Sequence, residues 1–250
     1  MNKHGVLLLI VMAASLQAAA QFTTTAHSAR NSAMGGCLLL QADSGAHLSI
    51  GWRQGYLAQG MSTRHLAADA QLGTSGHAYG TYSHFGDATY HEQQAALAYA
   101  IRASQWLNIG VYGTYSHIGT NDGHYDSHQW LDGGVMIQAS DNMHIAGYLA
   151  AGSRSWDEQQ RFGVRAGFAY KPARSITTVV EYALEERSRV RCGIEYVYEN
   201  HYYARAGLFT NPVTMTFGLG YAQRHYTIDL GTEVHPILGL SPQISLGLCL

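Results

Sequence analysis

Alternation of apolar and polar residues in short runs is the feature that most limits what this chain can fold into. In TMTFGLGY, residues 214–221, every second residue from Met215 is apolar, and the others are Thr or Gly. The same pattern occurs in RFGVRAGFAY, residues 161–170, and in YTIDLGTEV, residues 226–234. Because successive side chains of a strand point to opposite faces, these runs predict strands with one apolar and one polar face.

About fourteen such runs cover the chain from residue 45 onward, separated by turn signals such as Asn211-Pro212. Twelve strands is the alternative count. The runs lie near 45–58, 65–72, 76–86, 90–103, 107–119, 128–140, 143–153, 161–171, 176–186, 189–199, 201–210, 214–225, 226–235 and 243–250.

The lengths of these runs indicate how the chain would cross a membrane. Beyond Gln21, no stretch approaches the roughly 18 consecutive apolar residues that a membrane-spanning helix needs. Tilted strands of about 9–11 residues are long enough to cross. The sequence therefore predicts an all-β fold, an antiparallel transmembrane β-barrel with a short N-terminal segment in or near the lumen.

The chain divides into three parts. Residues 1–20 carry Lys3, an apolar run and three alanines before Gln21, which is typical of a cleaved signal peptide. Residues 21–44 precede the first strand and form a hatch-like segment, and residues 45–250 form the barrel. Export and a barrel fold together predict a bacterial outer-membrane location, with membrane lipid as a partner.

An octapeptide repeat supports this architecture. YGTYSHFG at 79–86 recurs as YGTYSHIG at 112–119, an interval close to two strands with their turns. The copies should lie two strands apart, at the same height and running the same way, with tyrosines in the aromatic girdle of one rim. The rim residues are Tyr82, His84, Tyr115 and His117. A shared metal or catalytic site is the less favoured alternative, because metal-ligand spacing is missing.

Alternation also places charged side chains of both signs inside the barrel. They can pair across neighbouring strands in a lumen that hydrocarbon cannot fill. A charge-paired plug of the interior is favoured over a polar path for a solute, because selective pores usually carry rings of one sign. The predicted lumen network consists of Arg165, Glu181, Glu185, Arg191, Glu195, Arg205 and Asp229.

Several function classes lack support. The sequence has no H-E-x-x-H motif, paired C-x-x-C motif, G-x-S-x-G elbow, P-loop or dinucleotide fingerprint, so no enzyme activity, cofactor or metal is expected. Lys occurs only at positions 3 and 171, and nothing in the composition suggests a basic nucleic-acid-binding patch. Three cysteines, an odd number, exclude a complete disulfide framework.

The N-terminal segment FTTTAHSARNSAMGGCLLLQADSG, residues 22–45, resembles the signature of the PorV/PorQ branch of the FadL-like outer-membrane proteins. The matching residues are Ser28, Ala29, Arg30, Ala33, Met34, Gly35, Gly36 and Asp43. The region from ARAGLF to SLGL is similar to the closing pattern of that family, including Asp229. Two features depart from it: no W-N-P-A-x-L segment follows the glycines, and the last residue is Leu250 rather than an aromatic residue.

The resemblance implies a barrel of about fourteen strands that serves as an accessory or carrier component linked to type IX secretion, with other secretion-system or outer-membrane proteins as partners. A FadL-like channel for small hydrophobic molecules is the first alternative, which an apolar lumen pocket would favour. A structural barrel and an outer-membrane phospholipase-type enzyme are further alternatives. The hatch motif comprises Ser28, Arg30, Met34, Gly35 and Gly36.

The hatch motif leads to two interpretations. A Gly pair suits a backbone that turns with positive φ or passes close to a wall. Residues 22–44 could then fold into the barrel mouth, with Arg30 reaching Glu181, Glu195 or Asp229. Alternatively, the glycines form a simple turn that leads into the first strand.

Overall fold

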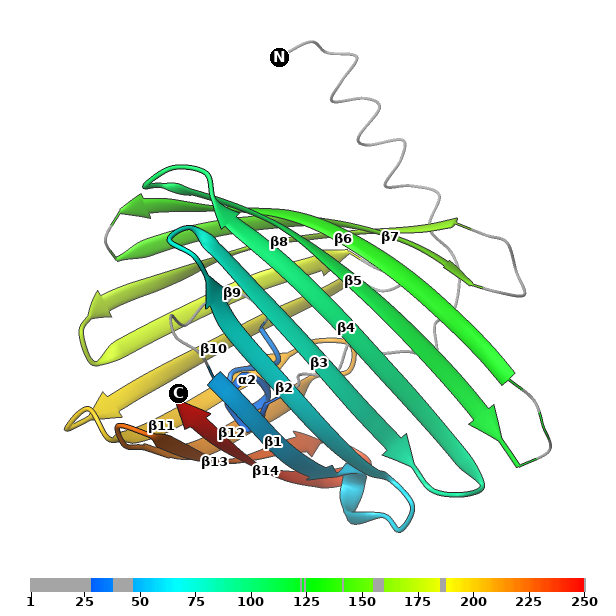
Figure 1. The fold of residues 1–250 in the computed structure, drawn as a ribbon. Coiled ribbons are helices and arrows are strands. Elements are labelled where there is room, and N and C mark those ends of the chain that lie inside the picture. Colours follow the sequence, from blue (N-terminus) through cyan, green and yellow to red (C-terminus); the bar gives the residue numbers. More distant parts are fainter. Residues whose placement is uncertain are drawn as a thin grey trace.

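The computed structural model describes residues 28–37, 47–121, 123, 125–140, 142–154, 160–184 and 188–249. The predicted signal peptide and Glu185 lie outside these residues, as do residues 21–27 and 38–44 of the hatch-like segment. The described residues form fourteen strands, each antiparallel to its neighbours, and β1 pairs with β14 to close the barrel (Figure 1).

The strand bounds agree with the predicted runs to within a few residues, and fourteen strands rather than twelve are present in the described chain. The strands are β1 His47–Gln54, β2 Ser62–Leu72, β3 Gly76–Gly86, β4 Tyr90–Arg102, β5 Leu107–Thr120, β6 Tyr125–Ser140, β7 Met143–Arg154, β8 Gln160–Ala173, β9 Ile176–Leu184, β10 Ser188–Tyr198, β11 Tyr202–Phe209, β12 Thr214–Ala222, β13 Tyr226–His235 and β14 Gly239–Cys249.

The first run is shorter than predicted. Strand β1 ends at Gln54 instead of residue 58, and the 3₁₀ turn η2, Gly55–Leu57, follows it. Tyr56 and Leu57 have φ values of 53° and 54°, which an extended strand does not accommodate. Alternation alone does not reveal this break, because the local residue types remain compatible with a strand.

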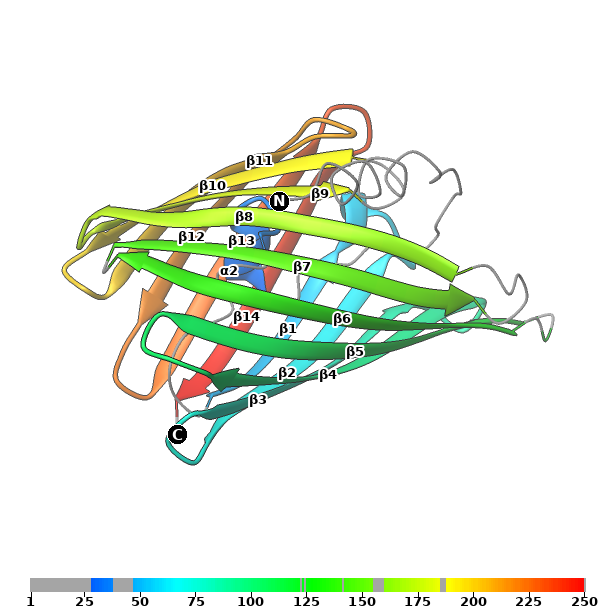
Figure 2. The ribbon, with the colours of Figure 1, turned by 90° about the horizontal axis from the view of Figure 1, so that it is seen from above.

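Strand length differs around the barrel. Strands β4 to β8 have 12–16 residues, whereas β9 and β11 to β13 have 8–10. Figure 2 shows the long strands forming one wall, with the shorter strands on the other side of the helix α2, Ala29–Ala33. The helix contacts β11, β12 and β13, so it lies against the short wall.

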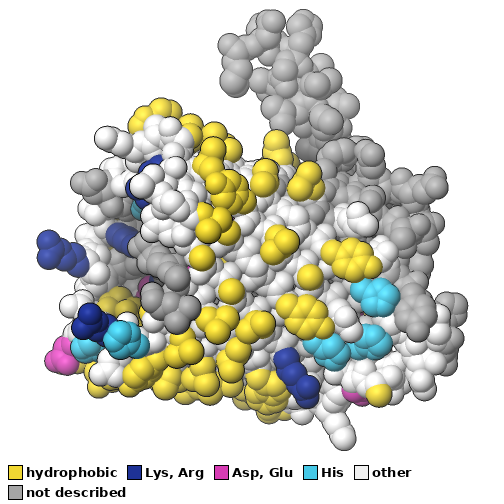
Figure 3. Space-filling view, viewed as in Figure 1, with side chains coloured by type: hydrophobic (Ala, Val, Ile, Leu, Met, Phe, Trp, Pro, Cys, Tyr) yellow, Lys and Arg dark blue, Asp and Glu magenta, His cyan; other side chains and the backbone are white. Residues whose placement is uncertain are grey.

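The two faces of the strands are as the alternation predicts. Leu219 is 64% exposed and Phe168 is 41% exposed on the outer surface, whereas Thr216 on the inner face is fully buried. Figure 3 shows apolar side chains spread over much of the outer surface. The helices within the described ranges are too short or too polar to span a membrane.

The octapeptide repeat lies on β3 and β5, which run in the same direction with β4 between them. Tyr82 and Tyr115 both pair with Ala95, so they stand at the same height. The predicted relation between the two copies is confirmed. The repeated octapeptide is therefore a duplication of sequence on two strands of the same continuous sheet.

Candidate functional site

The N-terminal helix α2 lies inside the barrel against β11, β12, β13 and β14 (Figures 1 and 2). Ser28 caps its start, since the Ser28 hydroxyl accepts a hydrogen bond from the Asn31 N–H at 3.1 Å. A helix of five residues has little stability of its own. Contacts with the barrel wall must therefore hold it in place.

Glycines on neighbouring strands make room for this segment. An added Cβ would lie 2.5 Å from the Met34 carbonyl oxygen at Gly193 and 2.5 Å from the Gly35 nitrogen at Gly207. At Gly218 it would lie 2.5 Å from the Cβ of Ala33. We call the inner surface formed by Gly193, Gly207, Gly218 and Gly231, on β10 to β13, the glycine seat.

The turn after the helix fits the same surface. Gly35 and Gly36 have φ values of 75° and 73°, a conformation that favours glycine. A Cβ on Gly35 would also stand 2.6 Å from the Cys192 carbonyl oxygen. Both reasons for a Gly pair, positive φ and close approach to a wall, apply to Gly35.

Polar side chains of the wall bind the main chain of the segment. The Thr216 hydroxyl accepts a hydrogen bond from the Gly35 N–H at 3.1 Å and donates one to the Ala33 carbonyl at 2.9 Å. The Ser245 hydroxyl accepts one from the Ala29 N–H at 3.3 Å. These bonds supply wall partners to main-chain groups at both ends of the helix, where intrahelical partners are lacking or shared.

Arg30 joins a chain of charges on the inner wall. Its Nε and Nη2 donate to the two carboxylate oxygens of Glu195, each at 3.1 Å. Glu195 also accepts from Arg205 Nε at 2.7 Å, and Arg205 Nη1 donates to Asp229 at 2.5 Å. Gly220 lies between Arg205 and Asp229, and a side chain there would obstruct this contact. Of the three carboxylates considered for Arg30, the structure brings it to Glu195.

The other predicted lumen residues within the described ranges also lie on the inner wall. Glu181 and Arg191 face each other on β9 and β10 and pair at 2.7 Å, with both side chains buried. Arg165 is buried on the inner face of β8. Six of the seven predicted residues are within the described ranges, and their ion pairs include Glu181–Arg191, Glu195–Arg205 and Arg205–Asp229.

A second contact between segment and wall was not predicted from the sequence. The Ser32 hydroxyl donates to the Glu233 carboxylate at 2.5 Å, and Arg53 of β1 donates to the same carboxylate at 2.7 Å. Alternation in β1 and β13 places Arg53 and Glu233 on the inner face. Their convergence depends on closure between β1 and β14, which a one-dimensional pattern does not encode.

The segment ends in an apolar cluster within the lumen. Met34 and Cys37 are fully buried there, and burial raises the pKa of the Cys37 thiol, with the Glu181 carboxylate adding to the effect. The cluster consists of Met34 and Cys37 from the segment and Ala146, Ala169 and Val179 from the wall, with Met136 packed against it. We call it the lumen apolar cluster. It spans β6 to β9 and neighbours the glycine seat.

The predicted rim residues lie on the outer surface. Tyr82 and Tyr115 are 43% and 48% exposed, and His84 and His117 occupy the next outward-facing positions toward the end of β3 and β5. Within the described part of the chain, no three His, Cys, Asp or Glu side chains are grouped as metal ligands would be. The rim is thus separate from the segment in the lumen.

Comparison with known proteins identifies the fold. No protein-family model matches the sequence, and no curated protein shows significant sequence similarity to it. The structure is similar to the toluene transporter TodX of Pseudomonas putida, with 12% identity, a TM-score of 0.63, and coverage of 91% of this chain and 97% of that one. It is also similar to the toluene transporter TbuX of Ralstonia pickettii, with 11% identity, a TM-score of 0.59, and coverage of 88% and 96%.

These likenesses define the class of architecture, a closed fourteen-strand antiparallel β-barrel that the chain shares with the two toluene transporters. At this level of identity they establish the fold and leave the activity open. They do not distinguish the PorV/PorQ branch, which the N-terminal motif suggests, from other barrels of this architecture.

Proposed function

We propose that this protein is a bacterial outer-membrane channel for small hydrophobic molecules, with residues 28–37 closing its lumen. The lumen apolar cluster carries the proposal, because a barrel with a purely structural role has no need of apolar side chains inside a polar lumen. The exposed apolar outer surface supports a membrane location. TodX and TbuX, which share the fold, are described as toluene transporters.

In this proposal the described conformation is the closed one. Met34 and Cys37 cover Val179 and its neighbours on β6 to β9. Movement of the segment away from the wall uncovers an apolar surface at which a hydrophobic solute can replace them. The residues of the wall bind the solute when the segment has moved, and the segment excludes it when docked. No chemical step is assigned to any of these residues.

The contacts of the segment are suited to reversible movement. When Arg30 leaves, Glu195 keeps its hydrogen bond to Arg205, so no buried carboxylate loses every partner. When Ser32 leaves, Glu233 keeps Arg53. The free energy of opening is thereby lower than it would be for an isolated buried ion pair.

An accessory or carrier role linked to type IX secretion is the second candidate. The motif residues Ser28, Arg30, Met34, Gly35 and Gly36 favour it through their resemblance to the PorV/PorQ branch. This role requires a protein partner at one mouth of the barrel. Co-purification of a secretion-system protein with the parent, together with toluene uptake no faster than in empty cells, would support it over the channel.

The channel is tested by solute uptake in cells that lack other hydrocarbon channels. Toluene uptake should rise when the parent is expressed, and Val179→Thr should reduce it because a hydroxyl replaces a methyl group in the lumen apolar cluster. Val164→Thr is the matched control, since Val164 is 41% exposed on the outer surface. Deletion of residues 22–36 should leave a folded barrel with higher conductance in planar bilayers.

Uptake of toluene no faster than in empty cells would overturn the proposal that the channel carries small hydrophobic molecules. Equal conductance of the deletion variant and the parent would overturn the closing role of the segment. The two results are independent, because one concerns the solute and the other concerns the pore.

A further inference from the structure

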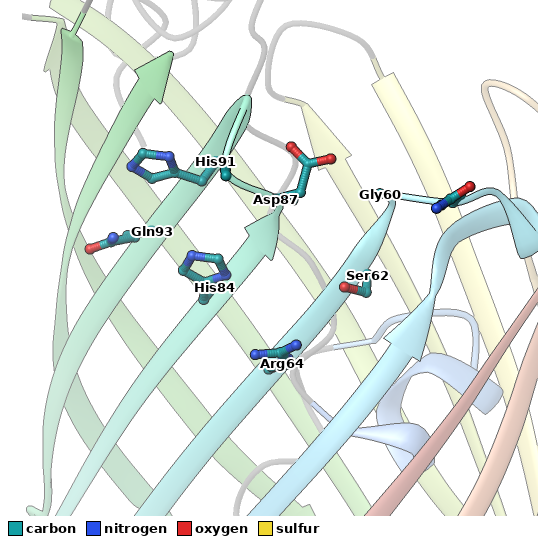
Figure 4. A pocket seen from close by; sticks show the side chains of 10 residues that line it. Gly60, Ser62, Arg64, His84, Asp87, His91 and Gln93 are labelled. Atoms are coloured by element: carbon teal, nitrogen blue, oxygen red, sulfur yellow. The ribbon is translucent and has the colours of Figure 1, made fainter. Parts of the chain in front are cut away.

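A polar hollow lies on the outer surface of the barrel, where β2 and β4 begin and β3 ends. It has a volume of about 710 Å³, and its side chains come from all three strands (Figure 4). Arg64, His84 and Gln93 face outward at matched positions of these strands, because Arg64 pairs with His84 and His84 pairs with Gln93 in the sheet register. His91 stands beside them, nearer the turn.

The two imidazoles of this hollow are arranged in parallel. The rings of His84 and His91 are 6.0 Å apart between centroids, with an angle of 3° between their planes. Gly119 on β5 makes this possible, since a Cβ there would lie 2.6 Å from the His91 ring. The wall thus provides a recess that fixes the His91 ring, as a preorganised binding group requires.

Arg64 has no acidic partner among the described residues, and its side chain is exposed. Asp87 lies at the edge of the hollow, on the turn between β3 and β4. Its carboxylate accepts hydrogen bonds from the N–H groups of Thr89 and Tyr90 at 2.8 and 3.2 Å, and these bonds lower the pKa of Asp87. The Asp87 carboxylate is thus engaged with its own turn, and the guanidinium of Arg64 remains available.

The hollow borders the apolar outer surface. One outward position farther from the rim stand Leu66 and Tyr82, 44% and 43% exposed, and Leu97 beyond them is 76% exposed. Figure 3 shows histidine side chains and a basic side chain together at one end of the apolar surface. An arginine and two histidines at this boundary stand where the charged headgroups of membrane lipids begin.

We propose that this hollow binds the phosphate of an anionic lipid headgroup. An Arg guanidinium presents a planar fork that matches phosphate oxygens, and imidazole N–H groups and the Gln93 amide donate to the same oxygens. The acyl chains of the same lipid would lie along Leu66, Tyr82 and Leu97. A soluble phosphate compound could use the polar donors but not this apolar track.

The connections at this end place the lipid in the outer leaflet. They include residues 55–61 and 155–159, whereas the longest connection between described strands at the opposite end is 103–106. Outer-membrane barrels have short periplasmic turns and longer extracellular loops. The ligand is therefore a phosphorylated lipid of the external face.

The proposal is tested with the purified barrel in detergent, by native mass spectrometry during titration with lipid A, phosphatidylcholine or inorganic phosphate. Lipid A should bind more tightly than zwitterionic phosphatidylcholine. Arg64→Gln should weaken lipid A binding about tenfold, the effect of losing one charge-assisted contact, and His84→Gln should weaken it by a smaller factor. Arg224→Gln, an exposed arginine in the turn between β12 and β13, is the matched control and should bind as the parent does.

Equal affinity of the parent and Arg64→Gln for lipid A would overturn the site, provided that both variants show the same heat-dependent gel migration. Equal losses in Arg64→Gln and Arg224→Gln would show nonspecific attraction of charge and overturn it as well. Binding of inorganic phosphate as tight as that of lipid A would assign the hollow to soluble phosphate instead of a lipid. None of these outcomes depends on whether the barrel transports hydrocarbons.

Discussion

Replacement of Arg30 by alanine is the sharpest test of how the N-terminal segment is held. The substitution removes two charge-assisted hydrogen bonds to Glu195, each 3.1 Å long. Glu195 is left with Arg205 at 2.7 Å, so the cost stays below that of a fully orphaned buried carboxylate. The side chain of Arg30 is 25% exposed, and we expect a loss of ~2 kcal/mol in the docking of the segment.

The rate at which a reagent modifies Cys37 measures this loss of docking free energy. It is fully buried in the lumen apolar cluster, and its raised pKa keeps the thiol protonated and slow to react. In a background carrying Cys192→Ser and Cys249→Ser, a maleimide reagent can modify only Cys37. When opening is fast relative to labelling, a loss of ~2 kcal/mol raises the labelling rate roughly 30-fold.

The matched control is Arg174→Ala, which removes an exposed arginine in the turn between β8 and β9. It should label at the rate of the parent, and all variants should keep the heat-dependent gel migration of a folded barrel. Labelling of the parent as fast as that of the urea-unfolded chain would refute the buried position of Cys37. An unchanged rate in Arg30→Ala would refute the contribution of the Arg30–Glu195 pair.

Three further outcomes are expected. Gly193→Val should expel the segment, because the new Cβ would lie 2.5 Å from the Met34 carbonyl oxygen. Cys37 should then label rapidly in a barrel that is still folded, and slow labelling would contradict the glycine seat. Leu219→Arg should lower the stability of the barrel by about 2–4 kcal/mol if the position is near the bilayer midplane, measured by urea unfolding in lipid vesicles, whereas Thr216→Arg should disturb the docking of the segment more than the barrel. The mature protein should fractionate with the outer membrane, and recovery in the soluble periplasmic fraction would refute a membrane barrel.

Much of the wall could be predicted from the sequence because a strand has a period of two. Alternation identifies the inner face of each strand, and the Glu181–Arg191 and Glu195–Arg205 pairs then require only that neighbouring strands be in register. The octapeptide repeat also predicts that β3 and β5 carry equivalent residues at the same height in the barrel. These features depend on residues that are near one another along the chain or along the sheet.

The position of the N-terminal segment could not be predicted in the same way. Arg30 had three candidate carboxylates on different strands, and only the depth of the helix in the lumen selects Glu195. The glycine seat was missed because each of its glycines, read singly, is an ordinary strand residue in a Gly-rich barrel. The outer hollow was missed for a related reason: Arg64 and His91 become neighbours only across three strands.

The long sequence separation between the segment and its seat has a consequence for assembly. The contacts of α2 join residues 165 to 216 positions apart, so the first described segment binds to strands made near the end of the chain. Contacts of such separation form late in folding. A nascent barrel that has not yet added β11 to β14 lacks the strands that α2 contacts most, and its interior is still open to water. Docking of α2 therefore reports that the final strands are in place. An incomplete barrel in the membrane would lack the docked segment and would let solutes leak through its open interior.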